Sequence, residues 1–157
     1  MPQNLVGERV RFSGAQRVQE GGRCRVRVRL EVASTGAHVV GTAEGSSSLE
    51  DQLRSAAEAT LNALRQTPHA QNTVLELRDV TTFAAFGKSG VMVSLRGERD
   101  KQSRPLTGFS PVRDDADDSA PEVQIDVERR TVVQVANVAK AVALAILSAT
   151  NRFLAST

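Results

Sequence analysis

Two halves of this chain share one residue pattern, and this internal repeat constrains the fold more than any other feature. The matching residues keep their order, while the shift between the halves grows from 65 to 67 and then to 83 residues. Such a repeat predicts one domain built from two copies of a strand-strand-strand-helix unit. The matches are Val10, Phe12, Gly22, Val26, Val28 and Leu30 with Leu75, Leu77, Gly87, Val91, Val93 and Leu95, then Val39 and Gly41 with Leu106 and Gly108, then Ala56, Leu61 and Leu64 with Ala139, Leu144 and Leu147.

Alternation of apolar and polar residues locates the strands. Residues 23–32 read RCRVRVRLEV, which puts apolar side chains on one face and four arginines on the other. We therefore predict an α+β domain over residues 1–157, with a mostly antiparallel sheet and two helices packed on one face. The first unit, about 5–67, has strands at 5–19, 23–32 and 37–43 and a helix at 49–66, and the second, about 73–157, has strands at 74–83, 91–97 and 105–112 and a helix at 130–154.

The second unit contains an acidic insertion before its helix. Residues 114–128 hold seven acids and no base. Runs of like charge are usually solvated, and acids near a helix N-terminus are mildly favourable. The cluster of Asp114, Asp115, Asp117 and Asp118 offers oxygen ligands, but it lacks the glycine and the final glutamate of an EF-hand loop. We predict no metal site here.

The last helix is apolar on every side. Residues 141–147 read AVALAIL, and the side of the helix away from its two apolar stripes carries Ala141, Ala145 and Ser148. A helix of this kind is normally buried all round, so one face needs a partner besides its own sheet. The commonest such partner is a second copy of the chain. We therefore predict a homodimer through these three residues, which Ala145→Glu would dissociate.

The basic residues gather in the first unit, where residues 1–32 hold seven arginines and three glutamates. If helices cover one face of the sheet, the arginines decorate the other and present a surface suited to phosphates. Two other interpretations remain open: the arginines solubilise an open sheet beside cross-strand glutamates, or the acidic insertion masks them. The arginines concerned are Arg9, Arg11, Arg23, Arg25, Arg27 and Arg29.

No motif of catalysis stands out. His38 and His69 have no nearby Cys, His or acid at the spacing of metal ligands, and no nucleophile motif accompanies them. Residues 86–89 read FGKS, but the position of the first P-loop glycine holds Thr82. Cys24 alternates with core residues and is interpreted as a buried strand residue. We predict a protein that is not an enzyme and has no cofactor.

Composition narrows the classes of partner and compartment. The chain has no Tyr and no Trp, which removes the side chains most common at binding hot spots and at base-stacking surfaces. The N-terminus lacks the pattern of a signal peptide, and no apolar run has the length of a membrane span. We expect a cytoplasmic protein that does not bind membranes.

The repeat and two short segments resemble the regulatory, dimerising domain of isopropylmalate and citramalate synthases. Residues 41–45, GTAEG, are similar to the glycine-containing approach to that family's first helix, and residues 145–152, AILSATNR, are similar to its closing helix. The resemblance implies a duplicated domain that binds an amino-acid effector near a subunit interface. It places the pocket in the loops before the helices, at 41–48 and 108–112. The insertion and the lack of a catalytic barrel are departures from that family.

These observations lead to two functional hypotheses. The first is a non-enzymatic, dimeric binding or regulatory module for a small effector or a protein partner. Its predicted ligand-binding residues are Gly41, Glu44, Gly45, Ser46, Ser47, Ser48 and Gly108, although the serines are also a helix-capping cluster. The alternative is a nucleic-acid-binding protein that uses the arginine-rich sheet face.

Overall fold

The computed structural model describes residues 10–112 and 129–155, and in them the elements follow the order that the repeat predicts. Residues 5–9 of the predicted first strand and the acidic insertion lie outside the described residues. The elements are β1 (Val10–Glu20), β2 (Arg23–Val32), β3 (Ala37–Ser46), α2 (Leu49–Leu64), the short 3-10 helix η1 (Pro68–Ala70), β4 (Thr73–Ala85), β5 (Lys88–Arg99), β6 (Gln102–Pro111) and α3 (Arg129–Ala155).

The strands form two separate antiparallel sheets. Sheet A has the order β1-β2-β3, and sheet B has the order β4-β5-β6. The α+β class, the two long helices and the antiparallel pairing are confirmed. The prediction did not divide the strands into two sheets, because alternation within a strand says nothing about which distant strands pair with it.

The two sheets are alike in local detail. In sheet A, the register between β1 and β2 shifts between Phe12 and Gly14, and in sheet B, the register between β4 and β5 shifts between Leu77 and Asp79. These β-bulges also lie 65 residues apart, as the sequence matches do. The β4–β5 hairpin turns at Phe86 and Gly87, where both φ angles are positive, as the tightest hairpin turns require.

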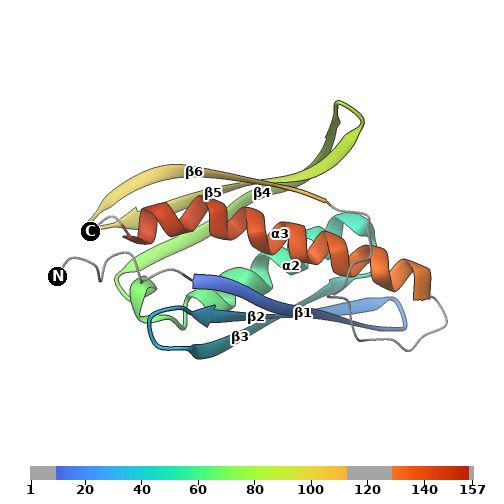
Figure 1. Cartoon of the computed structure of the whole chain (residues 1–157), viewed down its shortest axis with the longest axis horizontal. Coiled ribbons are helices and arrows are strands. Elements are labelled where there is room, and N and C mark those ends of the chain that lie inside the picture. Colours follow the sequence, from blue (N-terminus) through green and yellow to red (C-terminus); the bar gives the residue numbers. More distant parts are fainter. Residues whose placement is uncertain (1–9, 113–128, 156–157) are drawn as a thin grey trace.

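Both helices lie between the two sheets (Figure 1). Helix α2 packs on β2 and β3 and also contacts β4 of the other sheet, while α3 packs on β5 and β6 and also contacts β1. The helices touch each other as well. The side chain of Asn151 fastens α3 to β1, since it accepts a hydrogen bond from the N–H of Val10 and donates one to its carbonyl oxygen, both at 3.3 Å.

This arrangement gives α3 its second partner inside the same chain. Ala141 and Ala145 are buried in the core, and only Ser148 of the three predicted interface residues is exposed. Ala141 and Ala145 are therefore core residues, which corrects their assignment to a dimer interface. The inference went wrong because it treated the helix as the outer layer of a two-layer domain. The homodimer itself stays a prediction.

Candidate functional site

The loops before the helices are the first predicted site, and two of their glycines are covered by helix backbone. A side chain on Gly41 would overlap the carbonyl oxygen of Ala59 in α2, and one on Gly108 would overlap that of Ala145 in α3. Gly41 and Gly108 occupy matching positions in the repeat, and each lets a helix approach its strand closely. They are packing glycines, so their assignment to a ligand site is corrected.

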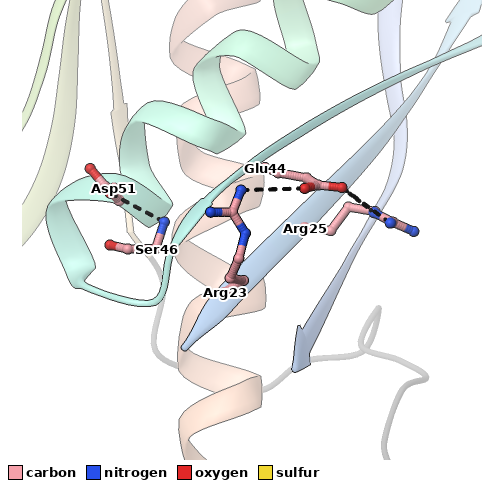
Figure 2. A network of polar contacts seen from close by, with 5 residues as sticks. All are labelled: Arg23, Arg25, Glu44, Ser46 and Asp51. Carbon is pink, nitrogen blue, oxygen red and sulfur yellow. Dashed lines mark hydrogen bonds and ion pairs between the residues drawn. The ribbon is translucent and has the colours of Figure 1, made fainter. Parts of the chain in front are cut away.

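The serine cluster is occupied by helix capping. The Ser48 side chain, at the N-cap of α2, accepts the N–H of Asp51 at 3.2 Å. The Asp51 carboxylate reaches back and accepts the N–H of Ser46, two residues before the N-cap, at 3.2 Å (Figure 2), so the two bonds form a variant of the capping box. The N–H of Ser47 bonds the carbonyl of Gly22, and the N–H of Ser48 bonds the Ser46 hydroxyl. An anion needs backbone N–H groups that have no other acceptor. The three serines therefore act as the capping cluster.

Gly45 completes this packed corner. A side chain there would lie 2.8 Å from the hydroxyl oxygen of Ser55 in α2. The Gln52 side chain, which is buried, donates to the carbonyl of Ser47 at 2.6 Å. Hydrogen bonds fill most of this corner, while the buried Oε1 of Gln52 has no hydrogen-bond partner among the described residues.

The cap predicts a pH-dependent contribution to stability. Hydrogen bonds from Ser46 hold the pKa of Asp51 below its ordinary value of 3.8. The stabilisation is therefore fully present above that value and is lost as the pH falls through the lower, folded pKa. We expect Asp51→Asn to lower the urea midpoint at pH 7 and to have a smaller effect near pH 3. Glu50→Gln, which removes a charge from the same helical turn, is the control, and an equal loss in both variants would contradict this role.

Glu44 belongs to the arginine surface instead of a pocket. Its carboxylate accepts the Arg25 Nε hydrogen at 3.1 Å and lies 3.5 Å from the guanidinium of Arg23 (Figure 2). The Arg25 hydrogen bond is the main cause that lowers the pKa of Glu44. All three side chains are exposed to solvent, so the ion pairs are weak and sensitive to salt.

The second predicted site is the outer face of sheet A, where four arginines lie in a row along β2. We call Arg23, Arg25, Arg27 and Arg29 the arginine row: they alternate along β2 with buried core residues, and all four are exposed. Arg11 on β1 joins the same face, where it pairs across the strands with Glu31. Arg9 lies outside the described residues. The structure thus brings together five of the six predicted arginines on one surface.

Arg27 and Arg29, at one end of the row, have neutral residues directly across from them, and Glu31 follows two positions beyond Arg29 on the same face. Directly across from Arg27 lie Gln16 and Thr42, and directly across from Arg29 lie Gly14 and Val40. Within residues 10–112 and 129–155, the ion pairs of this face join Glu44 to Arg23 and Arg25, and none involves Arg27 or Arg29. These two guanidinium groups therefore present their positive charge to solvent.

The remaining candidate residues do not form a chemical site. Cys24 is buried on the inner face of β2, and burial raises the pKa of its thiol. His38 is exposed at the start of β3, across from Glu31, and the side chain of His69 lies outside the described residues. Among the described residues, no three His, Cys, Asp or Glu side chains cluster in a way that would hold a metal ion.

An aromatic cluster on sheet B was missed by the sequence reasoning. The rings of Phe83 and Phe109 lie 5.1 Å apart and cover Gly90, while Met92 beside them is 40% exposed. Phe86 at the hairpin tip is 99% exposed. Phe83 and Phe109 are 26 residues apart, and only the register of β4, β5 and β6 brings them together. The alternation of each strand was the signal that could have placed them on one face.

Comparison with known proteins does not assign the chain to a family. No protein-family model matches the chain, and no curated protein matches it significantly. Neither helix, within its described residues, combines the length and apolar character that crossing a membrane requires.

Proposed function

We propose that this chain is a non-enzymatic binding module for nucleic acid and that the outer face of sheet A is its binding surface. The observation that carries the proposal is the pair Arg27 and Arg29, which are exposed, have neutral residues directly across from them on both neighbouring strands, and form no ion pair within the described residues. Guanidinium groups donate several hydrogen bonds in a plane and match phosphate oxygens in geometry and charge. A row of them supports contacts to several phosphates at once.

The small-effector hypothesis has less support from the same molecule. The corner at 41–48 is filled by helix backbone and by the capping bonds of Ser46, Ser48 and Asp51. At the second helix, Gly108 lies under the backbone of Ala145. The resemblance to a regulatory domain and the predicted dimer stay hypotheses, and an effector in either case would need a surface other than these corners.

Removing two positive charges from the arginine row tests whether this surface binds nucleic acid. We expect Arg27→Gln combined with Arg29→Gln to weaken the binding of a labelled 20-nucleotide DNA by at least about tenfold in low salt, since two charge-assisted hydrogen bonds are lost. Fluorescence anisotropy with the whole protein measures the affinity. Both side chains are exposed, so the thermal unfolding temperature should stay unchanged.

The matched control removes the same charge from the other sheet. Lys88 and Lys101 are exposed at the hairpin ends of sheet B, and Lys88→Gln with Lys101→Gln should retain most of the wild-type affinity. An equal loss in both double variants would mean that only net charge matters. An absence of binding to any nucleic acid in low salt would refute the proposed function.

A further inference from the structure

We propose that the arginine row binds the phosphates of one extended single strand, with one arginine for each successive phosphate and no contact to the bases. This inference rests on the proposed function and specifies the class of nucleic acid and the mode of contact.

The spacing of the row suits a single extended backbone. A β-strand rises about 3.4 Å per residue, so side chains two positions apart on one face are separated by about 6.8 Å. One nucleotide of an extended strand advances by a similar length. From Arg23 to Arg29 the row therefore spans about 20 Å and can meet four consecutive phosphates.

The shape of the face favours a flexible strand over a duplex. Strands twist along their length, so a row on β2 turns gradually, and a flexible single strand can follow it while a stiff duplex touches it over a short arc. The neighbours of the row leave it accessible, since Gly14 has no side chain and nothing lies within 4 Å of the position where one would begin. Arg23 and Arg25 keep further N–H donors beyond those facing Glu44.

The aromatic rings lie where they cannot assist this contact. Phe12, on β1, points to the inner side of sheet A, where it packs partly buried against the core. The exposed rings of Phe86 and Phe109 belong to sheet B, on the other side of the helix layer (Figure 1). Surfaces that bind single strands stack successive bases mainly on aromatic side chains, and phosphate contacts alone carry no sequence information. Binding on the row should therefore be independent of base sequence and strongly dependent on salt.

The salt dependence of binding to oligo-dT and oligo-dA of 20 nucleotides tests the inference. Four phosphate contacts to a single strand predict a slope of about −2.8 for log affinity against log salt, which is about a 50-fold loss between 50 and 200 mM. The two oligonucleotides should bind alike, and a duplex of the same length should bind more weakly. Removing Arg27 and Arg29 should reduce the slope to about −1.4.

A second variant separates the possible modes of binding. Phe86→Ser with Phe109→Ser removes the exposed rings of sheet B and should leave affinity and slope unchanged. A preference for duplex or for one base, a loss of affinity in this variant, or an unchanged slope after removal of the arginines would overturn the single-strand inference while DNA binding itself persists. Failure of every DNA to bind, with binding only of an acidic peptide such as residues 114–128, would overturn the proposed function as well.

Discussion

Replacing Ala145 with glutamate is expected to unfold the chain. Ala145 is fully buried at the centre of α3, and its backbone lies directly against Gly108 of β6. Glutamate would bring a larger side chain and a charge into a closely packed, apolar layer between two sheets. A buried charge without a partner typically costs about 3–5 kcal/mol, which is a large part of the about 5–15 kcal/mol that stabilises a domain. Circular dichroism and thermal melting measure the loss.

The control for this prediction lies one turn further along the same helix. Ser148 is exposed, so Ser148→Glu should leave the melting temperature nearly unchanged. If Ala145→Glu remained folded and only its molar mass fell in light scattering, α3 would form a subunit interface. The placement of Ala145 in the core of one chain would then be wrong. The melting temperature reports whether Ala145 is buried in the core, and the molar mass reports whether it lies in a dimer interface. The two measurements therefore distinguish these interpretations.

The second large effect is expected at Gly108. Its φ is not in the left-handed region, so the requirement for glycine comes from space alone. A Cβ there would overlap the carbonyl oxygen of Ala145 and lie 2.9 Å from the backbone nitrogen of Ala149. Backbone atoms cannot rotate away, so β6 and α3 would have to separate. We expect Gly108→Ala to lower the free energy of unfolding by about 3 kcal/mol, at the upper end of overpacking effects.

A glycine in open space provides the matched comparison. Gly14, at the bulge of β1, has no heavy atom within 4 Å of the position of a Cβ and no positive φ. Gly14→Ala should therefore have a small effect on the urea unfolding midpoint, while Gly41→Ala in β3 should behave like Gly108→Ala. Equal midpoints for Gly14→Ala and Gly108→Ala would show that α3 does not pack tightly on β6.

Much of the fold was predictable because its signals are local. Strand β2 was predicted with its observed bounds, Arg23–Val32, since each residue of the run alternates and turns flank it. The start of α2 at Leu49 follows from the serine cap. The observed ends of other elements differ from the predicted ends by a few residues. Strand β3, for example, continues to Ser46 instead of ending at residue 43, because its pairing with β2 extends to Arg23.

The candidate site was predictable in part, for the same reason. The outward direction of Arg23, Arg25, Arg27 and Arg29 is a property of one strand. The neutral residues across from Arg27 were not predictable, because Gln16 and Thr42 reach it only through the register of two strand pairs. The loops before the helices were misjudged because a glycine beside a helix looks the same in sequence whether a ligand or a helix backbone fills its space.

The sequence by itself determined the order of the elements, the faces of each strand and the arginine row, since these depend on spacing within a few residues. Only the tertiary structure decided that the strands form two sheets and that the helices lie between them. Contacts such as the one from Asn151 to Val10, 141 residues apart, set that arrangement. A helix that is apolar on every side requires burial on every side, but its sequence does not say whether the covering surface belongs to the same chain or to another.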